Sequence, residues 1–141
     1  MKSYVIDASV ACRFLLREDL SDEAILVLRG FLDGELELMA PELVNYEVGN
    51  ALWKAVRQGV LGLSEAELAY SDFLRLGLVQ LELGREQLVD ALIWGVRVDS
   101  TYYDSVYVSL SKSAGATFLT ADDALYEKIR GEIRVIHLRD F

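Results

Sequence analysis

Short apolar runs recur along the chain, separated by segments in which apolar residues repeat every three to four positions. The runs are typical of buried strands and the longer repeat is typical of amphipathic helices. The pattern predicts strands at residues 3–7, 35–40, 77–83, 116–120 and 134–138. It predicts helices after Asp7 and at residues 22–32, 42–58, 63–76, 85–96 and 102–114.

Strands that alternate with helices indicate βα units and a parallel sheet covered on both faces, which is an α/β fold. Strands buried on both faces read as continuous apolar runs, as residues 3–7, 116–120 and 134–138 do. The sequence contains no repeat, low-complexity tract or linker. We therefore expect one domain over residues 1–141, long enough to bury a sizeable core.

The composition narrows the chemistry available to this fold. The chain has one cysteine, Cys12, and one histidine, His137, which excludes an internal disulfide framework and a cysteine-based zinc site. We interpret both as packing residues, so carboxylates and hydroxyls remain for catalysis. No apolar run approaches the ~20 residues that span a membrane, and the first residues lack the features of a secretory leader. We expect a soluble, cytoplasmic protein.

Two acids follow two of the predicted strands. Asp7 ends the strand at residues 3–7, and Asp122 lies just past the strand at residues 116–120. Ligands of open parallel sheets bind beyond the carboxyl ends of the strands. The sequence therefore predicts that these two acids lie at one edge of one sheet.

Three further acids lie on predicted helices: Glu47, Asp104 and Asp123. Each of the five acids also has a purely structural interpretation, as a helix cap, a first-turn acid or a solvated side chain. Thr101 and Thr120 precede Asp104 and Asp123 at capping-box spacing, as Ser64 precedes Glu67. For Asp123 we favour the cap.

Taken together, acids gathered at one sheet edge repel one another unless a cation compensates their charge. Mg²⁺ and Mn²⁺ take carboxylate and water oxygens as ligands. Such ions activate water and stabilise the leaving oxygen in phosphodiester hydrolysis, which requires neither histidine nor cysteine. The acids therefore favour metal-assisted phosphodiester chemistry.

Three segments, in this order, resemble the PIN domain and, within it, the VapC-type toxin ribonucleases of prokaryotic toxin–antitoxin pairs. They are YVIDASV, APELVNYEVGNAL and YYDSVYVSLSKSAGATFLTADDALYEK. The resemblance covers nearly the whole chain. It implies a three-layer α/β/α sandwich around a parallel five-stranded sheet and Mg²⁺- or Mn²⁺-dependent cleavage of RNA.

The resemblance also implies roles for single residues. Asp7, Glu47, Asp104 and Asp122 would be catalytic, with Asp7, Asp104 and Asp122 holding the metal and Glu47 orienting or deprotonating the water. The resemblance implies supporting positions at Ser9, Asn50, Thr120 and Asp123. It further implies a homodimer and a small antitoxin protein as partner.

The formal net charge of −9 argues against strong electrostatic attraction to RNA. Four basic residues could still flank the cleft and contact phosphates, although solvated helix faces explain each of them equally well: Arg13, Arg17, Lys54 and Arg57. The surplus of apolar residues on helices is compatible with a dimer or a partner helix in a groove.

Other classes of protein remain as alternatives. A haloacid-dehalogenase-type phosphatase requires a second Asp two residues after the first, where Ser9 stands. A receiver domain requires paired acids after its first strand and a lysine after its last, and the chain has neither. A PIN nuclease for RNA maturation and a non-catalytic PIN scaffold share the same fold and stay open.

Overall fold

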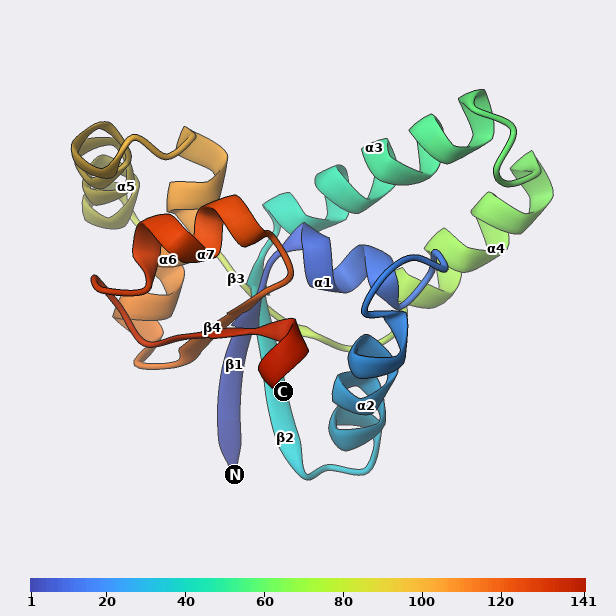
Figure 1. The fold of residues 1–141 in the computed structure, drawn as a ribbon, viewed down its shortest axis with the longest axis horizontal. Helices are drawn as coiled ribbons and strands as arrows, with labels where there is room; N and C mark the ends of the chain where they lie inside the picture. Colours follow the sequence, from blue (N-terminus) through green and yellow to red (C-terminus); the bar gives the residue numbers. More distant parts are fainter.

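All five predicted strands are present in one parallel sheet. A computed structural model describes residues 1–141, and Figure 1 shows its strands side by side at the centre of the molecule. The strand order is β3-β2-β1-β4-β5, and every neighbouring pair is parallel. The strands are β1 (Lys2–Ile6), β2 (Leu36–Pro41), β3 (Val79–Leu81), β4 (Thr117–Thr120) and β5 (Val135–His137).

Helices cover both faces of this sheet. In Figure 1, helices α1 to α4 lie to the right of the strands and α5 and α6 to the left, which confirms the three-layer α/β/α sandwich. The helices are α1 (Ala8–Arg13), α2 (Ser21–Leu32), α3 (Leu43–Arg57), α4 (Leu63–Leu74), α5 (Arg85–Val98), α6 (Tyr102–Ala114) and α7 (Asp123–Ile129), with a final 3₁₀ turn at Leu138–Asp140. None of these helices has the length and apolar character to cross a bilayer.

The centre of the core is the pair of strands β1 and β4. Val5 and Ile6 lie beside Phe118 and Leu119, and all four side chains are fully buried. Burial on both faces explains why these strands read as unbroken apolar runs. The chain builds outward from β1 through β2 to β3, then returns to the other side of β1 to form β4. The crevice at the carboxyl ends of β1 and β4 is therefore the topological switch point, where open α/β sheets bind ligands.

Two of the three predicted capping boxes are wrong. Helix α4 begins at Leu63, so Ser64 lies inside its first turn, and the Gly62 amide instead donates to the Glu65 carboxylate at 3.2 Å. At the start of α7 the cap is Asp122, which accepts from the Leu125 amide at 3.0 Å. The Thr120 hydroxyl donates to Asp7 and accepts from the Asp122 amide at 3.1 Å, so it does not form the predicted cap with Asp123.

The cap at α6 is confirmed on the Thr101 side. The Thr101 hydroxyl accepts a hydrogen bond from the Asp104 amide at 3.2 Å. Asp104 is therefore held in the first turn of α6, where the helix dipole favours a negative charge.

Candidate active site

Asp7 lies at the switch point, directly after β1. The residue caps α1 and is 4% exposed. Its carboxylate accepts hydrogen bonds from the Ser9 hydroxyl at 2.5 Å, the Thr120 hydroxyl at 2.5 Å and the Val10 amide at 3.2 Å. Thr120 ends β4, so these hydrogen bonds connect the two central strands at the sheet edge. Asp7 therefore both caps α1 and belongs to the candidate site.

Burial makes Asp7 an unusual acid. Removal from water raises the pKa of its carboxyl from the ordinary value of 3.8 to about 6, although the hydrogen bonds from Ser9, Thr120 and Val10 oppose this rise. The nearby charge of Asp104 adds to the rise. No basic side chain donates to Asp7, so its negative charge is buried without a protein cation.

Ser9 and Thr120 form the hydroxyl shell of Asp7, as expected for supporting residues. The Ser9 hydroxyl also accepts a hydrogen bond from the Ala121 amide at 2.9 Å and lies 3.4 Å from the Thr120 hydroxyl. This network fixes the loop that leads from β4 to Asp122. Each hydroxyl thus both orients Asp7 and positions the next acid.

Glu47 approaches the same site from the middle of α3. Its side chain is half-buried, and burial raises the pKa of its carboxyl, with a further contribution from the charge of Asp104. The hydroxyl of the fully buried Tyr107 donates a hydrogen bond to the Glu47 carboxylate at 2.6 Å. This hydrogen bond lowers the pKa of Glu47 and so opposes the rise. Helices α3 and α6 are thereby joined at the acid itself.

Asp104 and Asp122 complete the group. Burial raises the pKa of the Asp104 carboxyl, and the charge of Asp122 adds to the rise. The hydrogen bond with Thr101 and the charge of Lys128 lower this pKa. Asp104 therefore lies within electrostatic reach of Asp7, Glu47 and Asp122. The structure brings together the four acids that the sequence predicts: Asp7 and Asp122 at the starts of α1 and α7, Glu47 on α3 and Asp104 on α6.

The donor chemistry of this group fits a hard divalent cation. Several carboxylates have pKa values raised by burial and by one another, and a cation would reverse both effects. As placed, however, no three acidic side chains converge closely enough to hold one ion directly. Mg²⁺ keeps several water ligands and is commonly bound through one or two carboxylates. The site therefore fits an ion held partly through water.

Beside the acids lies a cavity of about 620 Å³, which we call the α3 cavity. Its wall includes Glu47 and Ser9 and is formed mainly by α1 and α3, with one residue from α6. The lining includes Ser9, Cys12, Arg13, Tyr46, Glu47, Asn50, Lys54 and Tyr103. Burial, followed by the charges of Glu18, Asp7 and Glu47, raises the pKa of the Cys12 thiol to about 12, so Cys12 is no nucleophile.

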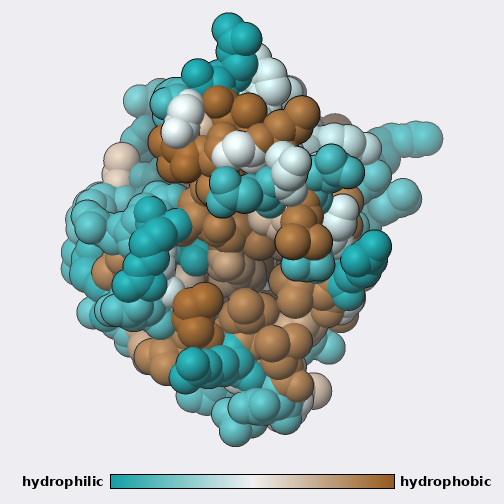
Figure 2. Space-filling view, turned by 90° about the vertical axis from the view of Figure 1, so that its right-hand side faces the viewer, coloured by the Kyte–Doolittle hydropathy of each residue, from teal (hydrophilic) through white to brown (hydrophobic).

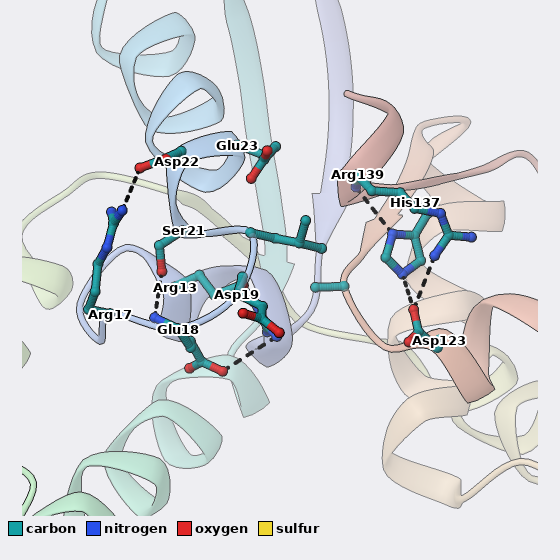
Figure 3. Close-up of a pocket in the computed structure, with 12 residues that line it drawn as sticks. Arg13, Arg17, Glu18, Asp19, Ser21, Asp22, Glu23, Asp123, His137 and Arg139 are labelled. Atoms are coloured by element: carbon teal, nitrogen blue, oxygen red, sulfur yellow. Dashed lines mark hydrogen bonds and ion pairs between the residues drawn. The ribbon is translucent and has the colours of Figure 1, made fainter.

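A second cavity of about 610 Å³ adjoins the first and shares Arg13 and Glu18 with it. Figure 3 shows His137 and Arg139 converging on Asp123 at one side of this cavity. The distances to the Asp123 carboxylate are 2.7 Å from His137 Nε2 and 3.1 Å from Arg139. Asp123 is therefore neither the cap of α7 nor part of the acidic group. His137 is buried and paired with Asp123, and it lies outside the acidic group.

The four predicted basic contacts separate into different environments. Arg13 lines both cavities but pairs with Glu18 at 3.4 Å, and Arg17 lines only the second cavity and pairs with Asp22 at 2.8 Å.

The other two lie on α3. Arg57 lies over the Trp53 ring, 5.9 Å from its centroid, away from the acids. Lys54 lines the α3 cavity and has no acidic partner. Lys54 is thus the best-placed cation for a phosphate.

Sequence reasoning missed two residues of the site. Tyr107 lies three residues after Asp104 on the same helix, a spacing that could have suggested it, but its hydrogen bond to Glu47 crosses 60 residues of sequence. Lys128 on α7 lowers the pKa of Asp104, and its ammonium donates to the Asp99 carbonyl at 2.5 Å. Neither contact has a local sequence signal.

Comparisons with known proteins agree with this arrangement. Residues 4–131 match the PIN domain. Ribonuclease VapC3 of Pyrobaculum aerophilum is 31% identical over 88% of this chain and 92% of its own length. Ribonuclease VapC1 of Mycobacterium tuberculosis is 30% identical over 89% of this chain and 90% of its own length.

Solved structures give the same result for the fold. PAE2754 from Pyrobaculum aerophilum superimposes with a TM-score of 0.73 at 26% identity, covering 98% of this chain and 92% of that one. VapC20 of Mycobacterium tuberculosis, described as a sarcin-ricin loop cleaving toxin, superimposes with a TM-score of 0.67 at 16% identity. The match covers 88% of this chain and 93% of that one. The second likeness is one of fold alone.

Proposed function

The chain belongs to the PIN-domain family, in its branch of VapC-type ribonucleases, and we propose that it hydrolyses RNA phosphodiester bonds with the aid of a divalent metal ion. The observation that carries this proposal is the acidic group at the switch point. Asp7 and Asp122 cap α1 and α7, Glu47 lies on α3 and Asp104 on α6, and Asp104 lies within electrostatic reach of the other three acids. A structural role alone gives no reason to bring four acids to one place.

The residues of this chain have distinct tasks in the proposed reaction. Asp7, Asp104 and Asp122 would hold Mg²⁺ or Mn²⁺, directly or through water. Such an ion, when bound, lowers the pKa of water and offsets the charge that develops on the phosphate. Glu47, whose pKa is raised, is suited to accept a proton from the attacking water. Tyr107 holds the Glu47 carboxylate in place.

The shell around Asp7 keeps the site ready for this chemistry. Ser9 and Thr120 fix both oxygens of the Asp7 carboxylate, so its orientation costs little further ordering when an ion arrives. The same hydroxyls hold the loop before Asp122. Losing either one should loosen two of the proposed ligands together.

The relatives named VapC support a role as the toxin of a toxin–antitoxin pair, and we propose a small antitoxin as partner. An apolar groove between α3 and α4 offers a place for an apolar partner segment. It is lined by Leu52, Trp53, Val56, Leu63, Ala66 and Tyr70, among others, and Trp53 and Leu63 are largely exposed. Figure 2 shows extensive apolar surface on this side of the molecule.

We also propose a homodimer that buries an exposed apolar face of α5. Leu88, Leu92 and Val96 follow one another at four-residue spacing, and all three side chains are exposed, as are Val89 and Ile93. An apolar stripe of this length on a surface helix usually marks a protein interface. The face lies apart from the α3–α4 groove, so one chain can use both.

The experiment that tests the nuclease proposal is a cleavage assay on structured and single-stranded RNAs with Mg²⁺, Mn²⁺ or EDTA. Wild type is compared with Asp104→Asn and with Asp33→Asn, a matched control because Asp33 is an exposed acid at the end of α2. We expect cleavage that requires metal, is lost in Asp104→Asn and is unchanged in Asp33→Asn. Equal activity of Asp104→Asn and wild type would contradict the proposed site.

A further inference from the structure

The α3 cavity carries features that hydrolysis of the phosphodiester bond does not itself require. Two tyrosine rings line it, Tyr46 from α3 and Tyr103 from α6, and they remain 64% and 59% exposed. Single exposed aromatic residues are ordinary on protein surfaces. Here two rings from different helices line the same hollow, and each directly precedes an acid of the proposed site, Glu47 or Asp104.

Polar groups without protein partners line the same cavity. The Asn50 side chain is exposed and makes no hydrogen bond within the protein, and the Lys54 ammonium has no acidic partner. Glu47, Asn50 and Lys54 follow one another along one face of α3, at spacings of three and four residues. An aromatic surface, a free amide and a free cation are the groups that contact a base, a base edge and a phosphate.

The overall charge favours a contribution from stacking. With a net charge of −9, the protein gains little from general attraction to the RNA backbone. Of the cations at the two cavities, Arg13, Arg17 and Arg139 are already paired with acids. Stacking of a base on an aromatic ring does not depend on net charge, and it requires a base that is not paired in a duplex.

We propose that the α3 cavity binds an unpaired nucleotide of the substrate next to the scissile phosphate, with its base stacked on Tyr46 or Tyr103 and its phosphate facing Lys54. This inference rests on the proposed nuclease function and adds to it the residues of this chain that hold an unpaired base beside the cleaved phosphate. The Tyr46 hydroxyl donates to the Glu42 carboxylate at 3.1 Å, which holds that ring in place before the base arrives.

The chain contains a matched control for the two rings. Tyr102 is also exposed and directly precedes Tyr103, but it lines a different hollow, beside Leu92 and Val96 of α5. Substituting Tyr102 removes an equivalent ring from the same turn of α6 that does not itself line the α3 cavity, although it lies 6.3 Å from the Tyr103 ring. Phenylalanine at position 46 or 103 keeps the stacking surface and removes only the hydroxyl.

The test is the fluorescence anisotropy of a labelled oligoadenylate, measured in EDTA so that binding is separate from cleavage. The same strand annealed to oligouridylate is the paired control. We expect alanine at the ring that stacks, Tyr46→Ala or Tyr103→Ala, to weaken binding of the single strand by about 5- to 100-fold. Tyr102→Ala and Tyr103→Phe should bind as wild type does, Tyr46→Phe should lose only the small part that ordering of its ring contributes, and the duplex should bind wild type weakly.

A salt titration gives a second, independent readout. If Lys54 contacts one phosphate, Lys54→Met should make the plot of log affinity against log salt shallower by about 0.7. The alanine variants of the tyrosines should leave this slope unchanged, because stacking releases no counterions. All four positions are exposed, so circular dichroism and thermal unfolding should show intact folds.

The outcomes separate this inference from the function on which it rests. Wild-type cleavage with Mn²⁺, together with tyrosine variants that bind oligoadenylate as tightly as wild type, would overturn the nucleotide site and leave the nuclease standing. A protein segment as the true occupant of the cavity would give that result. Wild type that neither binds nor cleaves any RNA, even with Mn²⁺, would overturn the nuclease and the nucleotide site together.

Discussion

Replacing Asp7 by asparagine should stabilise the metal-free protein at neutral pH, although it removes a proposed catalytic residue. The folded state holds the Asp7 proton more tightly than the unfolded chain, because burial raises the pKa from 3.8 to about 6. The stabilisation of the folded state by protonated Asp7 is fully present below pH 3.8 and is lost as the pH rises to about 6. At about 1.4 kcal/mol per pH unit over that interval, the ionised Asp7 costs about 3 kcal/mol.

Asparagine keeps the local hydrogen bonds while removing the charge. Its side-chain oxygen can accept from Val10 and Ser9, and asparagine caps helices as well as aspartate does. The Thr120 hydroxyl, which donates to Asp7, can rotate to accept from the new amide group. We therefore expect Asp7→Asn to recover most of the cost, with a gain of up to about 3 kcal/mol at pH 7.

The assay is urea unfolding in EDTA at a series of pH values between about 4 and 8, for wild type, Asp7→Asn and Asp33→Asn. The free energy of unfolding of Asp7→Asn relative to wild type should grow from near zero at about pH 4 to its full value above pH 6. Other titrating groups cancel in this difference, and Asp33→Asn should show no such trend. A difference that does not change with pH, or a variant less stable than wild type at pH 7, would refute the reasoning.

Three further changes test separate parts of the account. Tyr107→Phe removes the hydroxyl that holds the Glu47 carboxylate, so kcat for RNA cleavage should fall about 10- to 100-fold with KM unchanged; an equal rise in KM would contradict a positioning role. Gly95→Ala should lower the free energy of unfolding by about 1–3 kcal/mol in urea titrations, because the added Cβ would lie 2.5 Å from the Ser105 hydroxyl; unchanged stability would show that α5 and α6 separate freely. Leu92→Lys should convert a dimer to a monomer in light scattering, and a monomeric wild type would contradict the α5 interface.

The architecture could be predicted from the sequence because its signals are local. Burial of β1 and β4 on both faces produces the continuous apolar runs that mark them, and the rule for strand ends then places Asp7 and Asp122 together. The sequence offered Glu47 and Asp104 as candidate acids on helices, the resemblance to PIN domains implied their roles, and the structure brings both near the same edge. The sequence reveals those site residues that can be recognised from their position at the end of a predicted strand or on a predicted helix.

The errors and omissions have a common physical cause, which is competition between local and distant partners. Thr120 has the spacing of a cap for α7, yet its hydroxyl goes to Asp7, a contact across 113 residues of sequence. Asp122 takes over the cap, and Asp123 is free to pair with His137 and Arg139. Tyr107 was missed for the same reason, since its partner Glu47 lies on another helix.

The most direct test of the central claim, that the acidic group at the switch point binds a metal ion, is calorimetric titration of the protein with Mn²⁺ at pH 6. Buffers with different heats of ionisation report the protons released. Because the pKa of Asp7 is about 6, we predict saturable binding that releases about half a proton, since a carboxylate ligand must ionise. Asp104→Asn should weaken this binding strongly and Asp33→Asn should not. Binding that is absent in wild type, or equal in wild type and Asp104→Asn, would contradict the account.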